Sequence, residues 1–238
     1  MIEKLFIFLV AILPVAVLFE FIYVSDRYKC EPKKWLLAAF VFGILAAGVT
    51  WLAGFPTNGS GLYDNKPLNF IECLKNGFLL QAIPSELAKF MMLFLLLHIN
   101  KYYDEHIDSI VYSCCIALGF IGINNAYCLF TIDDWFSYGL VNALVLVPFH
   151  FAFGAIMGYL YGYSGFSENN KWTAWLFALV VTIVIDGIAS AILMSFDLTI
   201  NEMPLFAIYV IAIYIILYLL TKWGISHMLE EDREERYF

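Results

Sequence analysis

The sequence predicts an all-α fold, a polytopic bundle of about seven membrane-spanning helices. Hydrophobic residues make up 62% of the 238 residues and charged residues only 14%, and the mean hydropathy is +0.79. The apolar residues also occur in runs of roughly 20, which is the length that crosses a bilayer as a helix. A chain in lipid has to satisfy its own backbone polar groups, so such runs are expected to be helical.

The apolar runs divide the chain into seven segments, which we group into one transmembrane domain over residues 1–238. The segments lie near 2–24, 33–54, 71–99, 107–130, 137–162, 172–196 and 203–225. The connections between them are short, so no separate soluble domain is expected. The charged tail from Glu230 to Arg236 is interpreted as a solvated extension of the last helix.

Lysine and arginine are distributed unequally between the two sides of this predicted bundle. Nine of the thirteen fall on the side that holds the C-terminus, three fall on the other side, and Lys89 lies within a span. Because cytoplasmic loops carry the excess of positive charge, we expect the N-terminus outside and the C-terminus in the cytoplasm. Lysine and arginine do not cluster into a basic surface of the kind that binds nucleic acid, so we expect the protein to contact the lipid bilayer and not a nucleic acid.

Four polar residues lie at similar depths in four consecutive segments: Glu86, Asn124, His150 and Asp186. Counted from the cytoplasmic ends of their spans, they lie roughly 18–25 Å into the membrane at 1.5 Å per residue. Polar groups inside a bilayer usually face the interior of a bundle or a wet cavity. We therefore predict that these four side chains share one site.

Two prolines accompany this predicted site. Pro84 precedes Glu86 by two residues, and Pro148 precedes His150 by two residues. Each proline removes one helical hydrogen bond and frees the carbonyl group four positions before it. Such a break is either a packing kink or a place where the backbone meets water or a ligand.

Lys89 follows Glu86 by three residues and therefore lies on the same face of the helix. A lysine in the membrane needs a partner, and Glu86 is the nearest acid in the sequence. The pair is interpreted either as a structural ion pair or as part of the site. Gly154, Gly158 and Gly162 form two overlapping GxxxG steps, which we attribute to close helix packing.

The residues around these positions resemble the PrsW family of intramembrane proteases, which is related to the CAAX prenyl endopeptidases. The resemblance runs in order from about residue 20 to residue 190. It includes PSELAK (84–89), DEHIDSIVY (104–112), LGF (118–120), DRYKCEP (26–32), and His150 with GAIMG (154–158). The resemblance implies an integral protein of a bacterial plasma membrane that hydrolyses peptide bonds at or within the bilayer. It further implies a single-span membrane protein as substrate and a role in envelope stress signalling.

Several positions depart from the family pattern, which has Glu-Glu-x-x-Lys, a later Glu after a Phe, and two His in later spans. Glu86 and Lys89 match the second Glu and the Lys, and His150 matches the first His. Three positions differ, with Ser85, Asn124 and Asp186 standing where the family has Glu, Glu and His. The resemblance therefore implies an altered active set.

Three chemical schemes remain open for these residues. In the first, Glu86 is the general base, His150 donates a proton, Asn124 stabilises the oxyanion and Asp186 orients His150. In the second, Glu86 and Asp186 share one proton as an acid pair. In the third, Glu86, His150 and Asp186 hold a divalent metal such as zinc, a set with fewer nitrogen ligands than most catalytic zinc sites.

Three functions follow from these alternatives. The first is an intramembrane endopeptidase with an altered active set. The second is a pseudoenzyme, a non-catalytic relative that binds or scaffolds partner transmembrane helices, which the changes at Ser85, Asn124 and Asp186 favour. The third is a transporter or proton pathway, because carboxylates at the midplane of a membrane also serve that purpose. The sequence shows no inverted repeat, which disfavours the transporter.

Overall fold

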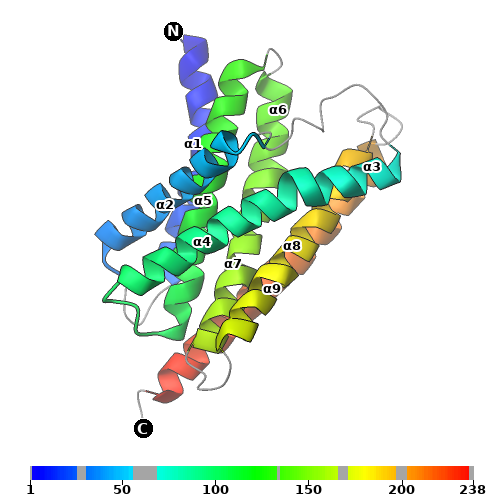
Figure 1. Cartoon of the computed structure of the whole chain (residues 1–238). Coiled ribbons are helices and arrows are strands. Elements are labelled where there is room, and N and C mark those ends of the chain that lie inside the picture. The colour runs from blue at the N-terminus through cyan, green and yellow to red at the C-terminus, as the bar shows by residue number, and fades with distance from the viewer. Residues whose placement is uncertain are drawn as a thin grey trace.

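The computed structural model describes residues 2–25, 31–55, 69–132, 135–165, 171–196 and 203–235, and all regular structure in these residues is helical (Figure 1). The elements are α1 (Ile2–Ser25), α2 (Lys33–Leu52), α3 (Phe70–Lys75), η1 (Asn76–Ala82), α4 (Ile83–Ile99), α5 (His106–Thr131), α6 (Trp135–Val141), η2 (Asn142–Leu146), α7 (Val147–Gly165), α8 (Lys171–Ser195) and α9 (Met203–Glu235). The elements η1 and η2 are π-helical turns. The all-α class predicted from the sequence is confirmed.

Seven stretches of the described chain are long and apolar enough to cross a membrane, as predicted. Two of these spans are composite: α3, η1 and α4 follow one another as one rod, and so do α6, η2 and α7 (Figure 1). The beginning of α1 and the end of α9 lie at opposite ends of the bundle (Figure 1), as an odd number of crossings requires. Helix α9 continues to Glu235, so the predicted helical extension into the charged tail is present.

Helix α5 occupies the centre of the bundle. Its apolar window is 94% buried, whereas that of α9 is only 6% buried. Helices α1, α2 and α7 pack around α5. Lipid tails are as apolar as leucine, so close van der Waals contact is what holds membrane helices together. A central helix has to be approached closely from several sides.

Glycines make this close approach possible. A β-carbon built at Gly43 of α2 would lie 2.0 Å from the carbonyl oxygen of Ile116, and one built at Gly119 of α5 would lie 2.0 Å from the carbonyl oxygen of Phe40. A β-carbon at Gly158 of α7 would lie 2.5 Å from the carbonyl oxygen of Ser109. The backbones of α2 and α7 therefore touch that of α5, which confirms the packing role predicted for the GxxxG steps.

Replacing Gly119 with alanine is expected to destabilise the fold by about 1–3 kcal/mol, because the added methyl group forces α2 away from α5. The matched control is Gly48→Ala on α2, where a β-carbon would meet no atom within 4 Å. Unfolding of the two variants in detergent micelles measures the difference. Equal stabilities for Gly119→Ala and Gly48→Ala would show that the backbones are not in contact.

The segment that opens α5 is held by side-chain caps. The Oδ2 atom of Asp108 accepts hydrogen bonds from the backbone N–H groups of Asp104 (3.1 Å) and Glu105 (2.9 Å). The hydroxyl group of Tyr112 donates to Oε2 of Glu31, which precedes α2. The caps satisfy backbone donors at the start of α5, and the Tyr112 contact ties that start to the entry of α2.

The two proline breaks take the form of π-helical turns. The N–H group of Ile83 donates to the carbonyl of Phe78, and that of Val147 donates to the carbonyl of Asn142, so each bond spans five residues. The carbonyl of Leu144, four positions before Pro148, accepts the hydroxyl of Tyr214 from α9. Turns of this kind occur frequently at functional sites. Here they directly precede the segments that carry Glu86 and His150.

Candidate functional site

Three of the predicted polar residues meet inside the bundle. Glu86 of α4, His150 of α7 and Asp186 of α8 each bring one potential ligand atom within 4.8 Å of the others. Their side chains are nearly inaccessible, with exposed fractions of 0%, 5% and 3%. Three helices far apart in the sequence thus contribute one ionisable group each to a single buried place.

Lys89 joins this group from the helix that carries Glu86. Its Nζ atom lies 2.5 Å from Oε1 of Glu86 and 3.2 Å from Nδ1 of His150. Lys89 is itself buried, and its Nζ lies 5.4 Å from the centroid of the Phe120 ring. An ammonium group can only donate hydrogen bonds, so Nδ1 of His150 is the accepting ring nitrogen in this arrangement. The ion pair predicted from the sequence is present.

Asp186 is oriented by two serine hydroxyl groups. Ser85 donates to Oδ2 of Asp186 at 3.2 Å, and Ser190, one turn further along α8, donates to Oδ1 at 2.9 Å. Ser85 therefore links α4 to α8. Sequence reasoning left the role of Ser85 open and missed Ser190, although an Asp-x-x-x-Ser spacing places both residues on one helix face.

Asn124 lies beside this group and not within it. Its Oδ1 atom accepts a hydrogen bond from the indole nitrogen of Trp51 at 2.8 Å. Asn124, Ser85 and Gln81 all line a small cavity of about 10 Å³, which is room for roughly one water molecule. Ser85 thus lines the same cavity as Asn124 and donates to Asp186. Trp51 was missed because a tryptophan near the end of a span is usually an interfacial anchor.

Aromatic rings form the wall next to His150. The ring of Phe120 lies 5.8 Å from the imidazole, and the ring of Phe153 lies 6.1 Å away at an edge-on angle. Both phenylalanines are buried. They exclude water from this side of the imidazole, which strengthens the electrostatic interactions of the neighbouring charges.

The negative and positive charges of the ionised side chains at this site do not cancel. Glu86 and Asp186 contribute two carboxylates and Lys89 one ammonium group, and Glu86–Lys89 is the ion pair that the described residues form here. Within the same residues, Oε2 of Glu86 is buried and has no hydrogen-bond donor. A buried net negative charge is unfavourable unless a proton or a cation neutralises it. The arrangement therefore favours a proton shared by the acids or a bound cation.

The donor set fits a divalent metal ion. One imidazole nitrogen and two carboxylates are ligands that zinc accepts, and three protein ligands are usual in catalytic zinc sites. Oε2 of Glu86, which accepts no hydrogen bond within the described residues, is available to such an ion. The hydroxyl groups of Ser85 and Ser190 donate to Asp186 and fix its orientation, as residues that hydrogen-bond to metal ligands commonly do. Lys89 competes for the same place, because its Nζ already contacts Glu86 and His150.

Comparison with known proteins agrees with the resemblance seen in the sequence. The family model described as PrsW family intramembrane metalloprotease matches residues 31–220. The matched region begins before α2 and includes Glu86, Lys89, His150 and Asp186. No solved structure matches the chain.

Curated relatives cover most of the chain. Protease PrsW of Bacillus subtilis is 28% identical over 181 residues, which are 74% of this chain and 77% of the relative. Protease PrsW of Clostridioides difficile is 29% identical over 195 residues, 80% of each chain. Protease PrsW of Shouchella clausii is 24% identical over 218 residues, 92% of this chain and 94% of the relative. The similarity therefore extends over nearly the whole bundle.

Proposed function

Because the chain belongs to the PrsW family of intramembrane metalloproteases and is an integral bacterial membrane protein, we propose that it hydrolyses peptide bonds of membrane proteins within the bilayer, with an altered active set. The observation that supports this most strongly is the meeting of Glu86, His150 and Asp186 within 4.8 Å, buried between three helices. The proposed orientation has the N-terminus outside, as the lysine and arginine distribution favours.

The metal that the family description implies would be held by Glu86, His150 and Asp186, and zinc is the ion we propose. A divalent ion there would polarise the scissile carbonyl group and stabilise the negative charge that develops on its oxygen. One nitrogen and two oxygen ligands are fewer nitrogens than in sites with two histidines. Asp186, which stands where the family has a second His, is one of the active-site residues that differ from the family pattern.

The side chains of this protein would move the protons. Hydrolysis needs an acceptor for a proton of the attacking water and a donor for the leaving amine. Oε1 of Glu86 lies 2.5 Å from Nζ of Lys89, so Lys89 can give one of its protons to the leaving amine and then take up the proton that this carboxylate oxygen received from the water. Ser85 and Ser190 keep Asp186 in place during these steps.

The substrates we propose are single-span membrane proteins, in the setting of envelope stress signalling that the sequence resemblance implies. A single helix can approach the bundle from the lipid. Its backbone hydrogen bonds must open locally before a peptide bond can react, since helical carbonyls are already paired.

The alternative is a pseudoprotease that binds partner helices without cleaving them. It is favoured by Ser85 and Asn124, since neither a hydroxyl nor an amide group replaces a carboxylate as a base without help. The amide oxygen of Asn124 is also already engaged by Trp51. In this function the ion pair of Glu86 and Lys89 would be structural, and binding of single-span proteins would occur without products.

Metal removal separates the two functions. The purified protein, reconstituted in vesicles with a panel of single-span membrane proteins, is expected to cleave at least one of them. A zinc chelator should abolish cleavage, and added zinc should restore it. Cleavage that survives exhaustive chelation would support the shared-proton scheme of Glu86 and Asp186. Binding without cleavage under all conditions would support the pseudoprotease.

Ser190→Ala is expected to lower zinc affinity or cleavage by about 10–100-fold, because it removes one of the hydroxyl groups that orient Asp186. The matched control is Ser195→Ala on the same helix, where the hydroxyl group is exposed and donates to the carbonyl of Ile192. Zinc titration and initial rates measure both variants. If Ser195→Ala had the same effect, the role assigned to Ser190 would be wrong.

A further inference from the structure

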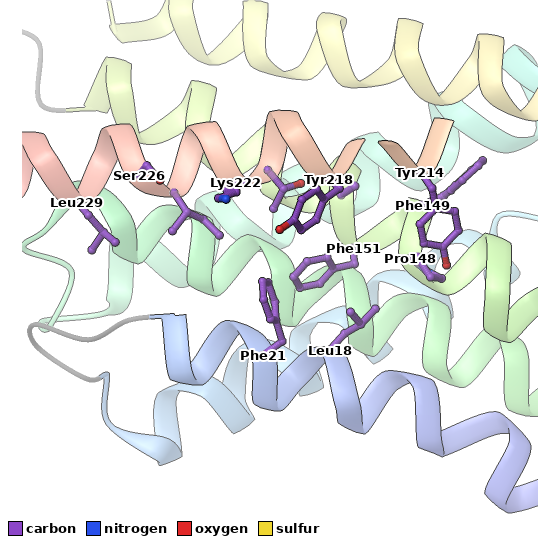
Figure 2. Close-up of a pocket in the computed structure, with 13 residues that line it drawn as sticks. Leu18, Phe21, Pro148, Phe149, Phe151, Tyr214, Tyr218, Lys222, Ser226 and Leu229 are labelled. Atoms are coloured by element: carbon purple, nitrogen blue, oxygen red, sulfur yellow. The ribbon is translucent and has the colours of Figure 1, made fainter. Parts of the chain in front are cut away.

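A groove lies between α1 and α9, with α7 as its floor (Figure 2). Its volume is about 560 Å³, within the range of about 300–1,000 Å³ that small-molecule sites occupy. The groove is separate from the candidate site. Pro148 and Ala152 line it two positions before and after His150, and residues two apart point to nearly opposite sides of an α-helix.

Most of the groove is apolar and aromatic. Figure 2 shows Phe21 of α1 and Tyr218 of α9 on either side of Phe151 of α7. Tyr214 closes one end beside Pro148 (Figure 2), and its hydroxyl is already used by the carbonyl of Leu144. None of the lining residues is acidic. This end of the groove therefore suits a hydrocarbon chain.

The part of the groove towards the end of α9 is polar and positively charged. Lys222 lines it and is its one charged residue, and no carboxylate among the described residues pairs with it. Thr221 is 8% exposed, and its Oγ1 atom has no hydrogen-bond partner in the described structure. Ser226 adds a second hydroxyl group one turn further on. An unpaired ammonium beside an unpartnered hydroxyl is complementary to an oxygen-rich anion.

The charge in the groove favours an anionic lipid over an apolar protein helix. Tyr214 and Leu229 bound the groove along α9, and a separation of fifteen residues spans roughly 22 Å. Lys222 lies between these two ends, so an anionic head group at Lys222 leaves the aromatic end beside Tyr214 to an acyl chain. An apolar transmembrane helix in the groove would leave Lys222 and Thr221 without a partner.

We propose that this groove binds one anionic phospholipid, with an acyl chain along Phe151 and Tyr214 and the phosphate at Lys222 and Thr221. Basic pockets between membrane helices recognise anionic head groups through this charge complementarity. The lipid would fill the space between α1 and α9, the helix with the smallest buried share of the seven. It would thereby brace α7 on the side opposite His150.

Native mass spectrometry of the full-length protein, with phosphatidylglycerol and phosphatidylcholine added in equal amounts, tests the proposal. The wild-type protein should retain one phosphatidylglycerol in preference to phosphatidylcholine. Lys222→Gln should lower this preference by about fivefold, and Thr221→Val should lower it in the same direction. Lys222 is exposed, so its replacement should leave the fold intact.

The matched control is Lys101→Gln, an exposed lysine in the turn after α4 that does not line the groove. It should leave the preference unchanged. An unaltered preference in Lys222→Gln, or an equal loss in Lys101→Gln, would overturn the proposal. A benzophenone amino acid in place of Phe21 should cross-link to phospholipid in vesicles. A cross-link to a polypeptide instead would assign the groove to a partner helix and reject the lipid.

Discussion

Replacing Glu86 with glutamine is expected to reduce substrate cleavage by at least about 100-fold, the lower range for loss of a general acid or base. Glutamine has the same shape, and its amide oxygen can still accept from Lys89, so the fold should be retained. It cannot take up a proton or supply an anionic ligand. Initial rates of cleavage in vesicles, together with an unfolding curve of the same preparation, measure the effect.

The control for this variant is Glu72→Gln at the beginning of α3. Glu72 is exposed and closes a capping box with Asn69, a function that glutamine also fulfils. Cleavage by Glu72→Gln should equal that of the wild type. Wild-type cleavage by Glu86→Gln would remove this carboxylate from the mechanism and leave the pair of Glu86 and Lys89 as a structural ion pair.

Lys89→Met is expected to destabilise the protein by about 3–5 kcal/mol, the usual effect of removing one partner of a buried ion pair. The reason is that, in the metal-free protein in which stability is measured, the carboxylates of Glu86 and Asp186 would then remain buried with no cation beside them. Most of the stability should return in the double variant Lys89→Met with Glu86→Gln, because only Asp186, with its two serine donors, stays charged.

Unfolding in detergent micelles measures the single and double variants side by side. Lys101→Met serves as the matched control, since Lys101 is exposed and outside the bundle core. It should change stability by less than about 1 kcal/mol, as exposed charges usually do. A double variant no more stable than Lys89→Met alone would mean that the charge of Glu86 is not what Lys89 neutralises.

The class of the fold was predictable because the length of the apolar runs decides it. Seven apolar runs of sufficient length have to become helices in lipid, whatever their neighbours are. The packing of α7 on α5 was predictable in part, since the spacing of Gly154, Gly158 and Gly162 indicates close contact, whereas the packing of α2 through Gly43 and Gly119 was not predicted. The partner helix was not predictable, because a small-residue stripe does not specify what it touches.

The meeting of Glu86, His150 and Asp186 was predictable, but the full composition of the candidate site was predictable only in part. Counting along helices places Glu86, His150 and Asp186 on one level, and the structure brings them together. Which side chains touch depends on the rotation of each helix about its axis. Two π-helical turns change that rotation just before Glu86 and His150, and no spacing rule reveals them. Asn124, at the same predicted depth, instead faces Trp51.

The proline breaks illustrate the same limit. The sequence shows that Pro148 frees the carbonyl of Leu144, but the group that satisfies this carbonyl is the hydroxyl of Tyr214, seventy residues away. The groove between α1 and α9 is a further case, since its lining comes from three helices and no local pattern marks it. Features assembled from distant helices require the structure.

The most direct test of the central claim is X-ray absorption spectroscopy of the purified protein after loading with zinc. The arrangement of Glu86, His150 and Asp186 predicts one bound zinc ion per chain with one nitrogen ligand, the remaining ligands being oxygens. His150→Gln and Asp186→Asn should each weaken binding and change the spectrum. Two results would contradict the claim that these three side chains form a metal centre. One is a wild-type protein that binds no zinc, and the other is a zinc spectrum that is the same in both variants as in the wild type.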